Sequence, residues 1–207
     1  MECTSAFETL KQDKNTEWNQ EIIQYQHGKE DRTMDLLEIM QNRRSVRNYT
    51  GEPISNDNLQ KILQAGLLSA SSRARCPWEL IVVRDKDVLK QMSECRIGSA
   101  KMLAGANAAI VVTANTAASD VWVEDCSIVM SNMHLMADSL GVGSCWIQGR
   151  LREAPDGRTT ETFLKELLKF PDGYALEAVL SIGMPDRHPA KHELSDLPLN
   201  KIHYEVY

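Results

Sequence analysis

Residues 43–53 read RRSVRNYTGEP, and this stretch says more about the chain than any other. It places three guanidinium groups and one hydroxyl within five residues, directly after a short segment whose apolar residues have helical spacing. Guanidinium groups bind phosphate oxygens in pairs, and each charge-assisted bond contributes about 1.5–3 kcal/mol. The stretch therefore predicts a site for a small anion. A basic helix end that complements its own dipole is the alternative.

The composition limits what this anion is. With 207 residues, of which 43% are hydrophobic, the chain can bury one sizeable core, so a single domain is expected. A net charge of −6 leaves no basic surplus for a nucleic acid. We therefore expect the arginines to serve one small anionic ligand.

The cysteines and histidines give no metal-binding pattern. The five cysteines form no CxxC pair, and an odd number is typical of reduced thiols in the cytosol. His188 and His192 are four residues apart, but Pro185 and Pro189 interrupt the segment, so solvated loop histidines are expected. No apolar run is long enough to span a bilayer, and the N-terminus lacks the signal-peptide pattern. These features favour a cytoplasmic protein without a metal or a membrane partner.

The first 33 residues differ from the rest of the chain. They are polar and mixed in charge, and one short helix from about Glu17 to His27 is expected around Trp18 and Ile22. Residues 1–33 are thus an N-terminal extension ahead of a domain at 34–207. The extension either packs on the body or on a partner subunit, or it results from an upstream start codon.

From residue 34 onward, helical and strand patterns alternate. Ser55 is the expected N-cap of a helix, with Ile54 and Leu59 packing together across its first turn. A helix over about 123–140 is apolar nearly all round, which predicts burial. Shorter apolar runs bounded by polar residues predict strands. The expected helices are at 34–42, after Ser55, at 88–95, around Lys101 and at 123–140, and the strands at 80–83, 108–113, 144–147 and 176–183. The tail after Pro185 is expected to be extended and to reach a partner subunit.

The arginine-rich stretch resembles the opening motif of the nitroreductase family, whose members bind FMN. Three more segments resemble motifs of that family in the same order. They are Ala70, Ser71 and Ser72 followed by Pro77-Trp78; residues 141–149, which include Ile147, Gln148 and Gly149; and residues 183–185 followed by Lys191. The resemblance covers residues 34–191. Ala74 and Cys76 stand where the family typically has Asn and Gln, which puts the contacts of those two side chains in doubt.

The resemblance implies a role for each matching residue. Arg43, Arg44, Ser45 and Lys191 would hold the FMN phosphate and ribityl chain, and Arg47 would lie near the N1/O2 edge of the flavin ring. The Ala70–Ser72 loop would lie against the ring, and Lys101 would lie on its pyrimidine. The main-chain N–H of Gln148 or Gly149 would donate to flavin N5, the atom that accepts hydride, so no catalytic side chain is implied.

The resemblance also implies the fold and the reaction. It implies an α+β fold with a central mixed sheet flanked by helices, and an intertwined homodimer with two FMN sites at the subunit interface. The implied reaction passes two electrons from NADH or NADPH to a nitroaromatic, a quinone or a related small-molecule acceptor, by ping-pong kinetics because one pocket serves donor and acceptor. The alternatives are another flavin chemistry on the same scaffold, such as reductive dehalogenation or ene reduction, and a non-catalytic flavin-binding protein.

Overall fold

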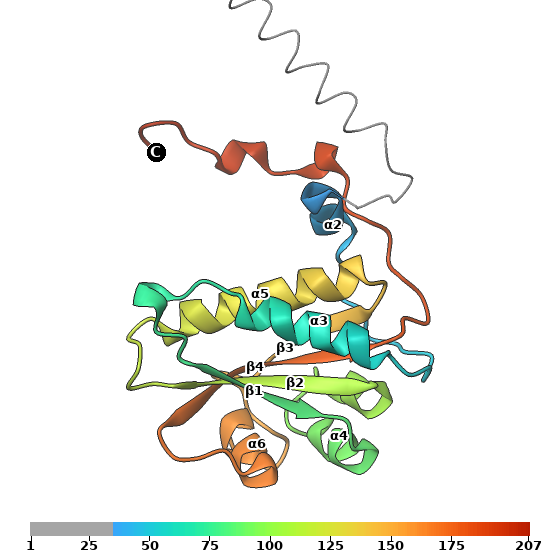
Figure 1. The fold of residues 1–207 in the computed structure, drawn as a ribbon, viewed down its shortest axis with the longest axis vertical. Coiled ribbons are helices and arrows are strands. Elements are labelled where there is room, and N and C mark those ends of the chain that lie inside the picture. Colours follow the sequence, from blue (N-terminus) through green and yellow to red (C-terminus); the bar gives the residue numbers. More distant parts are fainter. Residues whose placement is uncertain (1–34) are drawn as a thin grey trace, which may run out of the picture. The chain divides into compact units, whose positions relative to one another are not determined.

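The computed structural model describes residues 35–207 (Figure 1). The helix expected between Glu17 and His27 lies outside the described residues. The helices are α2 (Leu36–Asn42), α3 (Asn56–Leu67), α4 (Lys86–Met92), α5 (Trp122–Ser139) and α6 (Thr160–Leu168), and the strands are β1 (Trp78–Val83), β2 (Ala108–Asn115), β3 (Gly143–Gln148) and β4 (Tyr174–Gly183). Among these residues no helix is both long and apolar enough to cross a membrane.

One sheet organises the domain. Its strand order is β1-β2-β4-β3, and each neighbouring pair is antiparallel. Helices α3 and α5 cover one face, and α4 and α6 cover the other (Figure 1). The expected α+β fold with a central sheet flanked by helices is confirmed, but the sheet is antiparallel and not mixed as expected. Parallel pairing is confined, within residues 35–207, to an isolated bridge between Ser45 and Ser144, because the arginine-rich stretch runs beside β3 only at its start.

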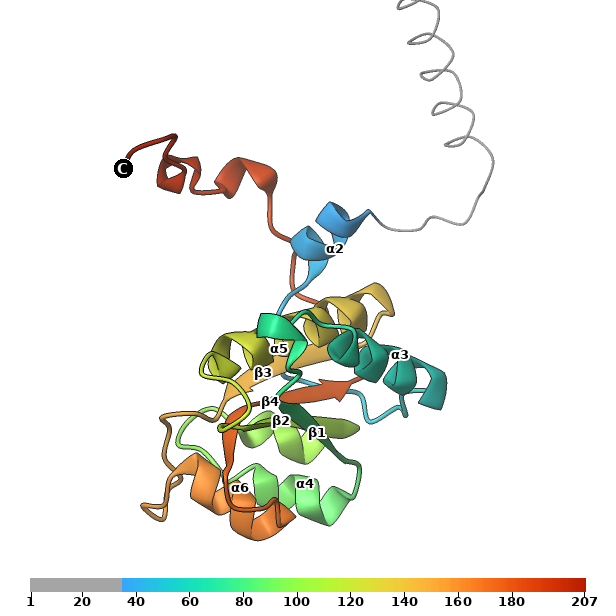
Figure 2. The same cartoon turned by 60° about the vertical axis from the view of Figure 1, so that its left-hand side comes forward.

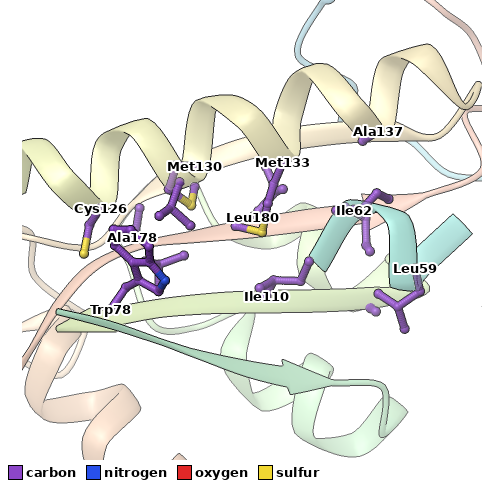
Figure 3. Close-up of a cluster of buried hydrophobic side chains, with 14 of the residues drawn as sticks. Leu59, Ile62, Trp78, Ile110, Cys126, Met130, Met133, Ala137, Ala178 and Leu180 are labelled. Atoms are coloured by element: carbon purple, nitrogen blue, oxygen red, sulfur yellow. The ribbon is translucent and has the colours of Figure 1, made fainter. Parts of the chain in front are cut away.

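Helix α5 forms the centre of the main core, as its sequence pattern predicts. Cys126, Met130 and Met133 are fully buried against the sheet (Figure 3). Helix α3 packs closely on α5 because Gly66 has no side chain. A Cβ at Gly66 would approach Met133 Cγ to 2.9 Å. The methionines of α5 therefore serve core packing.

Helix α3 starts where the capping pattern predicts. The Ser55 hydroxyl accepts a hydrogen bond from the Asn58 N–H at 3.0 Å, which satisfies one donor of the first turn. Ile54 and Leu59 are both buried in the main core, which agrees with the predicted packing across that turn.

Helix α6 was not among the expected elements, although its sequence carries the usual signals. Thr159 caps the helix by accepting a hydrogen bond from the Thr162 N–H at 3.0 Å. Leu164 and its apolar neighbours pack into the second core, which lies on the α4 side of the sheet. The helix ends at Lys169, which has a left-handed backbone with φ 61°.

Helix α2 and the tail after Pro185 lie together and contribute little to either core. The His192 N–H donates to the Gln41 carbonyl oxygen at 2.9 Å. Beyond that point the tail runs past α2 and away from the sheet, with two short 3-10 turns (Figure 2). Both segments expose large apolar side chains, namely Leu36, Leu37, Met40, Leu194, Leu197, Leu199, Ile202, Tyr204, Val206 and Tyr207. Within residues 35–207 this apolar surface, which we call the α2–tail surface, is left uncovered.

Candidate functional site

The arginine-rich stretch is held between two backbone segments. The Val46 N–H donates to the Ser144 carbonyl oxygen at 2.9 Å, which fixes the stretch to the start of β3. Its end pairs with the segment after β4, where the Thr50 N–H donates to the Met184 carbonyl oxygen at 3.0 Å. Gly143 permits this close packing, because a Cβ there would approach Val46 Cγ1 to 2.8 Å. The backbone that carries the arginines is therefore well fixed.

One basic side chain of the stretch, that of Arg44, reaches the C-terminal segment that contains Lys191. Arg44 donates to the Ala190 carbonyl oxygen, which places the next residue, Lys191, beside the arginines although they are far apart in sequence. Arg47 is exposed. The ion pairs found within residues 35–207 include none of Arg43, Arg44, Arg47 and Lys191. Their charge is therefore not cancelled by a paired carboxylate and is available to an anion.

Two buried polar residues of α5 support this basic group. His134 Nε2 lies 3.0 Å from Arg43 Nη1, and its Nδ1 bonds to the Ser144 hydroxyl. One turn further on, Asp138 accepts a hydrogen bond from Asn42 Nδ2 at 2.9 Å and lies 3.0 Å from His188 Nε2. His188 is an exposed loop residue, as predicted, but its ring also bonds to a buried carboxylate, which the sequence did not indicate.

His134 and Asp138 were missed in the sequence analysis. The available signal was two polar residues four apart on a helix that is otherwise apolar on that face. The pKa of His134 falls to about 4, first because burial disfavours the charged ring and second because the Arg43 guanidinium repels a proton. The imidazole is therefore neutral at physiological pH.

The loop at Ala70–Pro77 is fixed at the opposite end of α5. The Ser72 N–H donates to Asp125 Oδ1 at 2.7 Å, and the Ser119 hydroxyl donates to Asp125 Oδ2 at 2.9 Å. Ser71 accepts a hydrogen bond from the Cys76 N–H at 2.9 Å, while Ala70 is exposed. Asp125 lies in the first turn of α5, as expected, and also anchors the loop.

Three residues of this loop have a left-handed backbone without being glycine. Their φ angles are 52° at Arg73, 52° at Ala74 and 43° at Cys76. The left-handed region costs roughly 1–2 kcal/mol for most L-residues and less for Asn, whose side chain bonds locally. Ala74 stands where the family typically has Asn, so at this position the departure from the family pattern leaves backbone strain that Asn would lower.

Replacing Ala74 by Asn is expected to stabilise the protein by about 1 kcal/mol, because Asn tolerates the left-handed backbone. The midpoint of thermal unfolding should rise by a few degrees. The matched control is Ala104→Asn, an exposed site whose φ is not positive, where no gain is expected. Equal midpoints for the parent and Ala74→Asn would contradict the assignment of strain to this position.

The end of β3 offers one backbone donor at an open edge of the sheet. Strand β3 is an edge strand, and Ser144 turns its carbonyl outward to Val46. In an antiparallel strand the N–H and C=O groups of successive residues point alternately to opposite sides. Gln148 is four residues after Ser144, so its N–H also points outward. The Gly149 N–H instead donates inward to the Glu177 carbonyl oxygen at 3.2 Å. Of the two N–H groups predicted to lie near flavin N5, only that of Gln148 is therefore directed at the edge.

The side chains around this donor are all engaged. Ile147 is buried in the second core, so only its backbone is accessible at the edge. Gln148 Oε1 accepts a hydrogen bond from Trp146 Nε1 at 2.9 Å. A Cβ at Gly149 would approach Leu176 Cδ2 to 2.4 Å, so glycine is needed there for packing. This segment therefore offers an outward main-chain donor beside side chains that are already buried or hydrogen-bonded.

Lys101 does not join the basic group. It starts a 3-10 turn at Lys101–Gly105, and its Nζ lies 2.5 Å from both carboxylate oxygens of Glu94. No hydrogen bond or ion pair within residues 35–207 connects Lys101 to the arginines. Its predicted place on a flavin pyrimidine stays a prediction.

The anchors of the loop and of the arginines are well separated on α5. Asp125 holds the loop, and His134 holds Arg43 nine residues further along the helix. At 1.5 Å per residue this separation is about 14 Å. Within one chain, the Ser71–Ser72 loop and Arg43 are thus fixed to different ends of one helix.

Comparison with known proteins places the chain among flavin enzymes. The model of the "Nitroreductase family" matches residues 40–101 and 94–184. A protein of Archaeoglobus fulgidus named "Putative NADH dehydrogenase/NAD(P)H nitroreductase" is 38% identical over 84% of this chain and 99% of its own length. The NADPH-flavin oxidoreductase of Vibrio harveyi is 25% identical over 75% of this chain and 68% of its own. Among solved structures, an FMN-dependent nitroreductase from Clostridium difficile R20291 superimposes with a TM-score of 0.80 and 40% identity, covering 83% of this chain and 99% of its own.

Proposed function

Because this chain belongs to the nitroreductase family, we propose that it is an FMN-dependent oxidoreductase that passes two electrons from NADH or NADPH to a nitroaromatic, quinone or related small-molecule acceptor. One observation carries the proposal. Four cations, Arg43, Arg44, Arg47 and Lys191, gather without a carboxylate ion-pair partner in residues 35–207, beside the edge strand whose far end directs the Gln148 N–H outward.

The shape of this edge fits an elongated ligand with an anionic end and a polar ring. Ser144, at the arginine end, and Gln148 are four residues apart on β3, or about 13 Å at 3.3 Å per residue. The arginine end offers several charged donors to phosphate oxygens, and the Gln148 end offers one fixed backbone donor to a ring atom. FMN has its phosphate and its isoalloxazine ring at opposite ends, so its chemistry matches the donors along this edge.

Each residue then has a distinct part. Arg43, Arg44, Ser45 and Lys191 bind the phosphate and ribityl chain, and Arg47 places positive charge at the ring edge where negative charge develops on reduction. The Gln148 N–H orients the ring. Bound FMN supplies the redox chemistry, with hydride accepted at N5 and the electrons passed on to the second substrate. No side chain of the protein has to act as acid, base or nucleophile.

We further propose that the enzyme is a homodimer with its sites between subunits. In such a dimer the Ser71–Ser72 loop of one subunit would complete the site built by the arginines of the other. The α2–tail surface is apolar and uncovered within residues 35–207, which favours burial against a second copy.

The free cysteines at 76, 95, 126 and 145 are typical of a reducing cytoplasm.

The test is reconstitution followed by kinetics. The full-length protein incubated with FMN and desalted should retain a flavin absorption band, and it should oxidise NADH or NADPH in the presence of a quinone and of a nitroaromatic. Parallel double-reciprocal lines are expected if one pocket serves donor and acceptor in turn. Absence of a flavin band after incubation with FMN would refute the proposal. Retained FMN without turnover of either acceptor would favour a non-catalytic flavin-binding protein.

A further inference from the structure

We propose that His134 is a positioning residue of the anion site, which holds the Arg43 guanidinium in place for the phosphate of FMN. The inference rests on the proposed function and adds to it a residue outside the four family motifs. His134 is buried in the C-terminal half of α5, and its ring joins Arg43 on one side to Ser144 of β3 on the other. It therefore links the arginine-rich stretch to two elements of the main fold.

The chemistry of the two partners fixes the state of the ring. A guanidinium can only donate hydrogen bonds, so His134 Nε2, at 3.0 Å from Arg43 Nη1, must carry a lone pair. The ring's proton is then on Nδ1 and is donated to the Ser144 hydroxyl oxygen. This neutral tautomer alone satisfies the contact with Arg43, and the lowered pKa of His134 agrees with it.

A neutral partner suits an anion site better than a carboxylate would. A carboxylate would also hold Arg43, but its charge would oppose the binding of a phosphate. The imidazole uses one of the five N–H donors of the guanidinium, leaving four for the ligand and its positive charge uncancelled. An arginine side chain held in advance also loses less rotamer freedom when the ligand binds, which favours affinity.

The surroundings of His134 make it a firm support. Neighbouring residues of α5, Met130, Met133 and Ala137, are fully buried against the sheet and α3. Asp138, one turn away, bonds to Asn42, the residue directly before Arg43. The side chains of Arg43 and of the residue before it are thus both tied to the same helix.

The experiment compares FMN with riboflavin, which has the same ring and ribityl chain but no phosphate. Flavin-free full-length parent, His134→Leu and His134→Gln are titrated with each flavin, and the quenching of flavin fluorescence gives the dissociation constants. The Leu side chain cannot accept a hydrogen bond, so FMN affinity is expected to fall about tenfold while riboflavin affinity is unchanged. Gln keeps an acceptor for Arg43, and it should restore most of the loss.

The other outcomes separate the inference from the proposed function. If the parent does not bind FMN, the proposed function fails. If the parent binds FMN and His134→Leu binds it equally well, or loses FMN and riboflavin affinity equally, the positioning role is overturned. Ser144→Ala gives an independent reading should the Leu variant not fold, because it removes the partner of Nδ1. It is expected to lower FMN affinity and not riboflavin affinity, and equal effects on both would overturn the inference.

Discussion

Replacing Leu197, Leu199 and Ile202 together by serine is expected to convert the protein from a dimer into a monomer that no longer retains FMN. These side chains are 48%, 65% and 55% exposed within the described chain, so about half of each remains to be buried. Half-burial of such a side chain is worth about 1 kcal/mol. A twofold-symmetric interface counts each residue twice, so the loss is about 6 kcal/mol, or roughly 10⁴-fold in the dimer dissociation constant.

Light scattering coupled to size exclusion at micromolar concentration gives the oligomeric state, and the flavin band of the eluted peak gives FMN retention. The control is Ile97→Ser, which removes an apolar side chain that is 60% exposed in the turn after α4, apart from the α2–tail surface. It should leave a dimer that retains FMN. A triple variant that elutes as a dimer would mean that the tail does not form the interface, and a flavin-containing monomer would mean that each chain holds a complete site.

We also expect the free energy of unfolding to fall in mild acid because of His134. The unfolded chain takes up a proton on this residue near pH 6.5, whereas the folded pKa is about 4. The depressed pKa therefore gives its full stabilisation above pH 6.5, and this is lost as the pH falls from 6.5 to 4. The difference of about 2.5 pKa units corresponds to about 3 kcal/mol. Protonated His134 would also carry a donor toward Arg43 and break their hydrogen bond.

The measurement is urea unfolding of parent and His134→Leu from pH 7 to pH 4 at one protein concentration. The stability advantage of the parent over the variant should shrink by about 3 kcal/mol across this range. Arg43, directly after α2, contacts His134, and Asp138, which bonds to His188, follows one turn later on α5. Burial raises the pKa of Glu177, so this residue changes the free energy of unfolding with pH in the opposite direction to His134. Both proteins contain Glu177, so its effect cancels from the difference between them. A difference that stays constant with pH would contradict a neutral, buried His134.

The sequence predicted those elements whose signals are local. Helix α3 starts at its serine cap, and α5 is buried because its apolar residues recur on nearly every face. Thr159 and the apolar residues that follow it carried the same kind of signal for α6, so that helix was predictable and was overlooked. The four family motifs recovered the family, because their order along the chain constrains the fold more tightly than composition does.

The site depended on contacts that no local signal contains. Arg43 meets His134 across 91 residues, and Arg44 meets Ala190 across 146 residues. The choice between the Gln148 and Gly149 donors follows from the pairing of β3 with β4, since a shift of one residue would exchange them. These long-range contacts depend on strand register and side-chain packing, which cannot be read from local patterns of residue types.

Helix α5 acts as a spacer whose length, and not only its composition, is under constraint. One additional residue between Asp125 and His134 would shift one anchor by about 1.5 Å and turn it by about 100° relative to the other. Substitutions on the partly exposed face, such as at Ile128, leave both anchors in place. We therefore expect an insertion or deletion between these two anchors to be more damaging than a substitution on the exposed face of the helix.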